Sequence, residues 1–146
     1  MSFYHHYVFP RLLDFAMANR AFRKPRARTL APARGRILEI GFGTGMNLKY
    51  YPESVTRIEA IDPDLDLDRY SGPRIAASRI DVDFHHLDAE HLPFEPESFD
   101  TVVSTLTLCS IPDVAHALGE IRRVLKPGGQ FLFLEHGRSP DPKLAR

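Results

Sequence analysis

The 146-residue chain is long enough for one domain with a hydrophobic core, although it is short for a doubly wound fold. Its 19 basic and 19 acidic groups balance to a net charge of zero. The single cysteine, Cys109, excludes a disulfide scaffold, and no apolar run reaches the roughly 18 residues of a transmembrane helix. Because the first residues also lack the basic-then-apolar order of a signal peptide, the sequence predicts a soluble cytoplasmic protein.

The charge is unevenly placed along the chain. Residues 1–36 hold eight basic groups and one acid, Asp14, which gives this segment a net charge of +7. Such asymmetry is consistent with peripheral contact with a membrane surface, and also with a solvated helix face and linker. Nucleic acid is not expected as a partner, because the basic groups are not interleaved with a recognisable binding module.

The first predicted elements divide the chain into two parts. An amphipathic helix is predicted over residues 3–22, and a basic linker follows it. Residues 1–30 would then be a helical lid and linker, ahead of a ligand-binding domain over residues 31–146. The first strand of that domain is predicted at residues 36–40, an apolar run that leads directly into a glycine-rich turn.

This turn is the most informative stretch of the sequence, with alternating glycines at Gly41, Gly43 and Gly45. Glycine tolerates φ > 0 and has no Cβ, so a ligand can lie against the backbone of such a turn. The spacing is not the G-x-G-x-x-G of dinucleotide sites, since Met46 stands where the third glycine would be. Glu39, two residues before the first glycine, would repel a pyrophosphate and suits a ligand with a cationic amino group.

Helical and strand segments alternate through the rest of the chain. Helices are predicted from near Thr44, over residues 65–78 and from about Pro112 to Lys126, and strands at residues 57–61, 83–87, 101–104 and 130–135. Strands spaced by helices imply βαβ units and a parallel sheet, so the sequence predicts an α/β fold. In such a sheet a ligand binds beyond the carboxyl ends of the strands, where the strand order switches.

Five motifs, in the right order and with the right gaps, resemble those of the class I S-adenosylmethionine-dependent methyltransferases. They are the E-x-G-x-G-x-G turn, Asp62 at the end of the second strand, the Asp88–Phe94 turn, the Ser98–Ser104 strand and the Arg122–Gly129 link. Two further runs, Thr105–Asp113 and Phe133–Arg138, are similar to the methyltransferase type 11-like branch of small phospholipid or thiol methyltransferase-like proteins. The resemblance implies a Rossmann-like doubly wound parallel sheet with strand order 3-2-1-4-5.

The resemblance also implies S-adenosylmethionine as the cofactor. The glycine turn would admit the methionyl part, Glu39 would stabilise its ammonium through water or backbone order, and Asp62 would bind the ribose hydroxyls. Asp88 and the Ala89 amide would read the adenine edge, and the residues just past the fourth strand would flank the methyl donor. The predicted cofactor-binding residues are Glu39, Gly41, Gly43, Gly45, Asp62, Asp88, Ala89, Thr105 and Leu106.

The activity that the resemblance implies is methyl transfer to a small-molecule or lipid-like acceptor. Direct displacement depends on alignment and on exclusion of water, and it needs a base only if the acceptor arrives protonated. His136, Tyr4 and His5 are the candidates for that base. Cys109 is expected to be a packing residue. No metal site is predicted, because Leu67 stands where a calcium loop built on the neighbouring aspartates would need glycine.

The chain departs from the family after its last predicted strand. Class I methyltransferases carry two more strands there, whereas this sequence ends at Arg146. Phe131–Leu134 is apolar on both faces, which is typical of a strand buried on both sides. The sequence therefore predicts a sheet truncated after strand five, or a homodimer through this edge. Two alternatives to an active methyltransferase are a catalytically silent cofactor-binding fragment and a nicotinamide-dependent oxidoreductase, the latter disfavoured by Met46 and Glu39.

Overall fold

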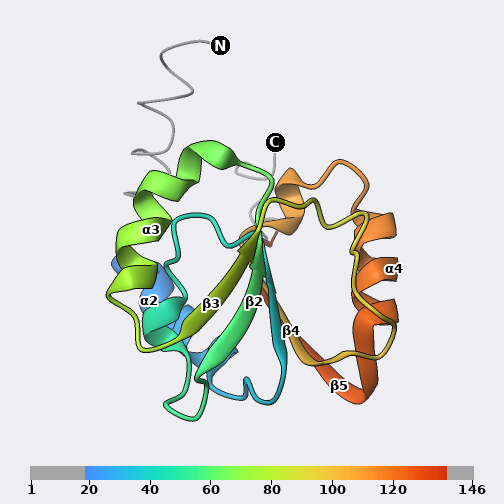
Figure 1. Ribbon diagram of the computed structural model, residues 1–146, viewed down its shortest axis with the longest axis horizontal. Helices are drawn as coiled ribbons and strands as arrows, with labels where there is room; N and C mark the ends of the chain where they lie inside the picture. The colour runs from blue at the N-terminus through green and yellow to red at the C-terminus, as the bar shows by residue number, and fades with distance from the viewer. Residues whose placement is uncertain (1–18, 138–146) are drawn as a thin grey trace.

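The computed structural model describes residues 19–137 and contains a five-stranded sheet in the order β3-β2-β1-β4-β5 (Figure 1). All four neighbouring strand pairs are parallel. The order confirms the predicted Rossmann-like doubly wound α/β sheet. The strands are β1 (Ile37–Ile40), β2 (Arg57–Ile61), β3 (Asp81–His85), β4 (Phe99–Thr105) and β5 (Leu125–Leu134).

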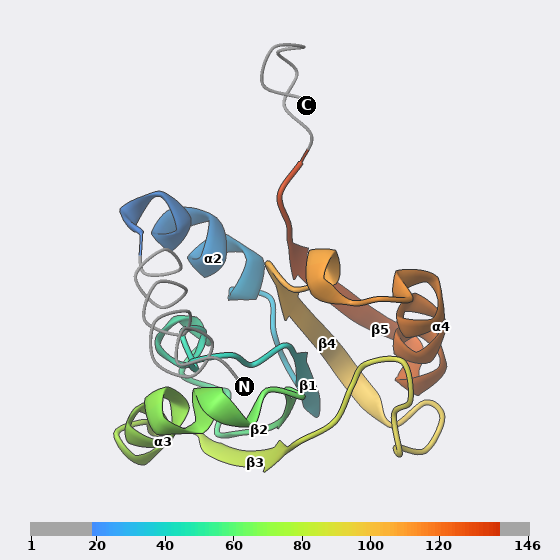
Figure 2. The same cartoon turned by 90° about the horizontal axis from the view of Figure 1, so that it is seen from above.

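Helices cover both faces of this sheet. The described α-helices are α2 (Arg23–Leu30), α3 (Asp68–Ala76) and α4 (Val114–Val124), and none of them is long and apolar enough to cross a membrane. α2 and α3 lie on one side of the sheet and α4 on the other (Figure 2). Because adjacent strand residues point to opposite faces, Ile37 joins the core that includes Leu30 of α2, whereas Leu38 joins the core that includes Ile121 of α4.

The predicted helix near Thr44 is wrong. The glycine turn leads only into the 3-10 helix η3 (Leu48–Tyr50). Gly45 has a φ of 77°, which is not helical, and Pro52 lacks the N–H that a continuing helix requires. The residues between them, 46–51, are too few for two α-helical turns. Tertiary contacts fix the loop instead, because Asn47 Nδ2 donates to Glu39 Oε1 in β1 at 2.8 Å.

The N-terminal part of the described chain also differs from expectation. The predicted helix over residues 3–22 falls largely outside the described residues, and the segment expected to be a basic linker contains α2. This helix shows little amphipathic pattern, because its two buried residues are an arginine and a leucine, Arg26 and Leu30. Elsewhere the boundaries move by a few residues: β3, for example, begins at Asp81 rather than at residue 83.

Strand β5 forms one edge of the described sheet, since it pairs with β4 alone. It is not buried on both faces as predicted, since its residues are half-buried or exposed whereas every residue of the central strand β1 is buried. Phe133 is 57% exposed, and its ring stacks on that of Phe131 with the centroids 5.2 Å apart. Apolar side chains therefore reach the surface at this edge.

Candidate cofactor-binding site

A cavity of about 470 Å³ lies at the carboxyl ends of β1, β2 and β4. Small-molecule sites have volumes of about 300–1,000 Å³. The lining comes from the segments that follow these three strands, joined by Leu87–Glu90, Arg26 and His136. The cavity lies where the sequence predicts a ligand, because β1 is the strand at which the order along the sheet reverses.

The glycine turn forms one wall of the cavity. Gly41 has a φ of 71°, and a Cβ at this position would collide with the side chain of Thr107. Gly43 also has a positive φ, 57°, but its added Cβ would meet only the Gly41 carbonyl oxygen, at 4.0 Å. Since Gly43 lines the cavity, a side chain there would occupy ligand space. Gly45 does not line the cavity, and it lies against the ring of Phe42 instead.

Asp62 follows β2 and fastens the glycine turn. Its Oδ2 accepts the Gly43 N–H at 2.8 Å, and its Oδ1 accepts the Asp64 N–H at 2.9 Å. Burial raises the pKa of Asp62, while these two backbone N–H groups act in the opposite direction. The carboxylate lines the cavity beside the turn, so the structure brings two predicted site residues, Asp62 and Gly43, into direct contact.

Glu39 does not line the cavity. It is 1% exposed, and it accepts hydrogen bonds from Tyr51 Oη at 2.6 Å and from Asn47 Nδ2 at 2.8 Å. Burial raises the pKa of Glu39 to about 7, against the effect of these two donors. Asn47 does line the cavity, so its amide is a hydrogen-bonded link between Glu39 and a ligand, and the Glu39 carboxyl also interacts electrostatically with Asp62 of the lining.

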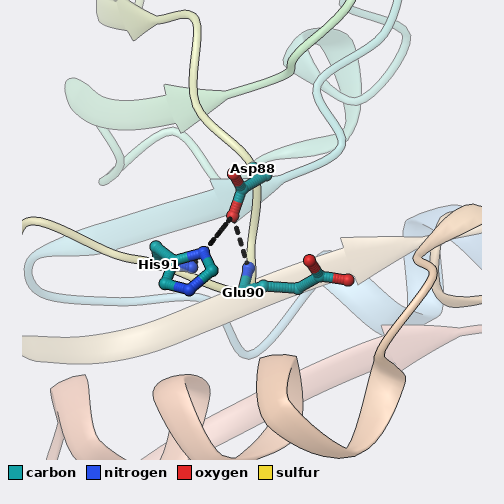
Figure 3. A group of neighbouring side chains, drawn as sticks. All are labelled: Asp88, Glu90 and His91. Carbon is teal, nitrogen blue, oxygen red and sulfur yellow. Dashed lines mark hydrogen bonds and ion pairs between the residues drawn. The ribbon is translucent and has the colours of Figure 1, made fainter.

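Asp88 holds the loop that follows β3 (Figure 3). Its Oδ1 accepts the backbone N–H groups of Glu90 and His91, both at 2.9 Å, and lies 3.3 Å from His91 Nδ1. Ala89 is buried and lines the cavity beside it. The side chains of Asp88, Glu90 and His91 bring two carboxylates and an imidazole together. Asp88 Oδ1 already binds the backbone of the turn, and Glu90 Oε1 accepts the Asp113 N–H at 2.6 Å. These hydrogen bonds give the three residues a structural role in fixing the loop.

Thr105 and Leu106 reach the cavity at the end of β4, as predicted. Leu106 has a φ of 57°, a conformation that costs a non-glycine residue on the order of 1 kcal/mol or more. Its N–H donates to the carbonyl oxygen of Leu134 in β5 at 2.6 Å. Thr105 Oγ1 accepts from Asn47 Nδ2 at 3.1 Å. Both residues are thus held by contacts with other segments.

Arg26 is a cavity residue that the sequence reasoning missed. Its side chain is on α2 and is 4% exposed. Nη1 donates to Asn47 Oδ1 at 2.6 Å and to Thr105 Oγ1 at 3.1 Å. The only local signal is the spacing of Arg26 and Leu30, which puts both on the buried face of the helix.

The candidate bases have different outcomes. His136 lines the cavity, and its ring contacts that of Phe22 with the centroids 5.8 Å apart. Tyr4 and His5 lie outside the described residues. Cys109 is exposed and lines the cavity, so the expectation of a packing residue is wrong. The reason is that the chain after β4 forms a short 3-10 turn at the cavity instead of entering the core.

The residues of this cavity fit S-adenosylmethionine better than a dinucleotide. Four carboxylates line the cavity, whereas Arg26 is the only lysine or arginine in the lining among residues 19–137. An acidic cavity opposes a pyrophosphate and favours a ligand with cationic groups, such as a sulfonium and an ammonium. The space in front of Gly43, which a Cβ would fill, allows such a ligand to approach the turn. The four carboxylates belong to Asp62, Asp64, Asp88 and Glu90.

Comparisons with known proteins identify the family of this chain. The protein family described as Methyltransferase domain matches residues 38–133. The chain is 34% identical over 128 residues to thiol S-methyltransferase TMT1B of Homo sapiens, an alignment that covers 82% of this chain and 50% of that protein. It is 30% identical over 137 residues to phosphatidylethanolamine N-methyltransferase of Cereibacter sphaeroides, with 86% of this chain and 63% of that protein covered.

The fold is likewise similar to that of solved structures. The YcgJ protein of Bacillus has a TM-score of 0.72 and 27% sequence identity, over 86% of this chain and 55% of that one. The chain therefore spans about half the length of TMT1B and of YcgJ. The match to the family covers most of the described sheet, from β1 to β5. The chain belongs to the methyltransferase domain family, as a class I, type 11 S-adenosylmethionine-dependent methyltransferase domain.

Proposed function

We propose that this chain binds S-adenosylmethionine and transfers its methyl group to a small-molecule or lipid-like acceptor. The observation that carries the proposal is the cavity at the carboxyl ends of β1, β2 and β4, with Gly43 open toward it and Asp62 bonded to the same turn. Bound S-adenosylmethionine supplies an electrophilic methyl group on a sulfonium. The residues of the chain bind it, orient it and exclude water.

Asp62 and the Asp88 loop are proposed to hold the nucleoside part of the cofactor. Each oxygen of the Asp62 carboxylate accepts one backbone N–H, and a carboxylate oxygen has two acceptor sites. Capacity therefore remains for the ribose hydroxyls. The bonds of Asp88 fix the backbone next to Ala89, whose amide is proposed to read the adenine edge. Glu39 is proposed to act on the methionyl ammonium indirectly, through the hydrogen bond that it accepts from Asn47.

The acceptor is proposed to lie against the segment that follows β4. This segment brings Leu106, Ile111 and Pro112 into the lining, which gives the cavity an apolar part suited to a thiol or amine on an apolar molecule. The names of the two relatives above describe action on thiols and on phosphatidylethanolamine. His136 is proposed to take the proton of an acceptor that arrives protonated, because it is the one histidine in the lining among the described residues.

The surroundings of the site belong to the same proposal. Residues 1–30 are proposed to act as a lid, which is supported by Arg26 of α2 in the cavity lining. The basic groups of this segment are proposed to make peripheral contact with a membrane carrying a lipid-like acceptor, in a cytoplasmic protein. The exposed ring of Phe133 supports a homodimer through the β5 edge.

Titration calorimetry tests the central proposal. The protein should bind S-adenosylhomocysteine and should not bind NADH. Asp62→Ala leaves ribose hydroxyls without an acceptor and should weaken binding by about 1–3 kcal/mol, and Gly43→Val fills ligand space in a backbone region that valine rarely adopts. Asp81→Ala, at an exposed position of β3, is the matched control.

The outcomes separate the alternatives. Binding of NADH alone, or wild-type affinity in both site variants, would contradict the assigned site. Far-ultraviolet circular dichroism should stay nearly unchanged in all three variants, which shows that lost binding is not lost folding. Methyl transfer to a thiol and to phosphatidylethanolamine is measured on the same samples, because a silent cofactor-binding fragment would bind S-adenosylhomocysteine without turnover.

A further inference from the structure

Arg26 is a buried cation that faces a ligand cavity from outside every motif of the sequence. We propose that its guanidinium binds a carboxylate of the ligand, namely the carboxylate of the methionyl part of the cofactor, so that α2 is part of the cofactor site. This inference rests on the proposed function, since it assumes that an amino-acid-bearing ligand occupies the cavity.

The hydrogen bonds of Arg26 leave its charge without an anionic partner in direct contact. Both bonds leave from Nη1 and end on neutral oxygens, Asn47 Oδ1 at 2.6 Å and Thr105 Oγ1 at 3.1 Å. A guanidinium has five N–H donors, so within residues 19–137 the donors on Nη2 and Nε remain for a ligand. A buried charge normally has a paired partner, because desolvation without one is costly.

The buried carboxylate of Glu39 does not bind Arg26 directly. Glu39 is connected to Arg26 only through the Asn47 side chain, which accepts from Arg26 on Oδ1 and donates to Glu39 on Nδ2. Burial lowers the pKa of Arg26, and the charge of Glu39 acts in the opposite direction. The two charged groups therefore interact across a neutral amide. Arg26 itself lines the cavity, and its guanidinium is bonded to two other lining residues, Asn47 and Thr105.

Charge balance in the cavity identifies the ligand group. Among the described residues of the lining, Arg26 is the only arginine or lysine, against four carboxylates. S-adenosylmethionine carries two cationic centres and one carboxylate, so its anionic group has one favourable location in this lining. A planar guanidinium can also bind a carboxylate through two parallel N–H bonds, which orients the methionyl chain as well as attracting it.

The test compares two ligands that differ in the carboxylate alone. S-adenosylhomocysteine has the carboxylate, and its decarboxylated analogue keeps the ammonium, the ribose and the adenine. In calorimetry, Arg26→Met should weaken binding of S-adenosylhomocysteine by about 10- to 100-fold and that of the analogue by less than about twofold. Arg28→Met, on the exposed face of the same helix, should leave both affinities unchanged.

Each other outcome overturns the inference in a distinguishable way. Equal losses for the two ligands would make Arg26 a structural residue, and an unchanged affinity for S-adenosylhomocysteine with a raised KM for the acceptor would assign its charge to the acceptor. If the wild-type protein binds neither ligand, the proposed function itself fails. Should Arg26→Met unfold, Arg26→Lys decides the question: the preference for S-adenosylhomocysteine over the analogue must fall by about fivefold or more, because an ammonium cannot reproduce the two-pronged contact.

Discussion

Replacing Glu39 by glutamine is expected to flatten the pH dependence of stability. Glu39 is 1% exposed, and burial raises its pKa from 4.5 to about 7 even though Tyr51 and Asn47 donate hydrogen bonds to it. Its pKa in the folded protein therefore lies above that in the unfolded chain. Between pH 4.5 and about pH 7 the folded state binds more protons than the unfolded state, so the free energy of unfolding falls as the pH rises through this window.

The magnitude follows from the two pKa values. Their difference corresponds to about 3 kcal/mol of stability, present below pH 4.5 and lost above about pH 7. Glutamine cannot ionise, and its Oε1 can still accept the bond from Asn47 Nδ2. The variant should therefore keep the stability that the wild-type protein loses. Asp62 also has a pKa raised by burial, but it is present in both proteins and cancels in the difference.

Urea unfolding of both proteins at about pH 5 and about pH 8 measures this difference. Unfolding free energies should fall by up to about 3 kcal/mol more in the wild-type protein than in Glu39→Gln between these two pH values. Parallel decreases in the two proteins would refute the reasoning, because they would show that Glu39 carries its charge in the folded state at no extra cost.

Two other predictions concern the acceptor and the sheet edge. His136→Gln should lower kcat/KM for a thiol acceptor by about 100-fold or more while leaving the affinity for S-adenosylhomocysteine unchanged, and an equal rate in both proteins would show that the acceptor loses its proton elsewhere. Phe133→Ser should shift a self-associated protein toward monomer in sedimentation velocity. The control Leu65→Ser, 64% exposed in the 3-10 helix Leu65–Leu67 that follows β2, should not. A wild-type protein that is already monomeric would contradict the homodimer.

The fold could be predicted from the sequence because its signals are local and repeat along the chain. The run Ile37–Ile40 precedes a glycine-rich turn and the run Arg57–Ile61 precedes an acidic turn, and both are strands at nearly the predicted bounds. The helix predicted from Thr44 failed where a tertiary contact competes with a local pattern. Asn47, within that segment, forms hydrogen bonds with Glu39 and with Arg26. Pro52 has no backbone N–H, so a helix that began in this segment could not continue through it.

The site could be predicted where its contacts follow the strands. Asp62 and Gly43 stand at the ends of adjacent strands in a parallel sheet, so their contact follows once the strand order is known. Arg26 could not be found in this way, because its contact with Thr105 joins residues 79 apart in sequence and comes from a helix without a clear apolar stripe. The one local signal, the four-residue spacing of Arg26 and Leu30, does not by itself mark this arginine as buried among the basic residues of the same segment.

Buried hydrogen bonds beside the cavity connect Glu39 to residues that border the ligand, which gives a physical basis for its predicted effect on the methionyl ammonium. One chain of buried hydrogen bonds connects Arg26, Asn47, Glu39 and Tyr51. Of these residues, Arg26 and Asn47 line the cavity. An amide can donate on one side and accept on the other, so Glu39 fixes the orientation of Asn47, and Asn47 fixes Nη1 of Arg26. The acidic residue of the glycine motif thereby holds in place the groups that border the ligand, without touching the ligand itself. This indirect action of Glu39 on the methionyl ammonium stays a prediction. It depends on the side-chain amide of Asn47, which lines the cavity, because the carboxyl group of Glu39 does not.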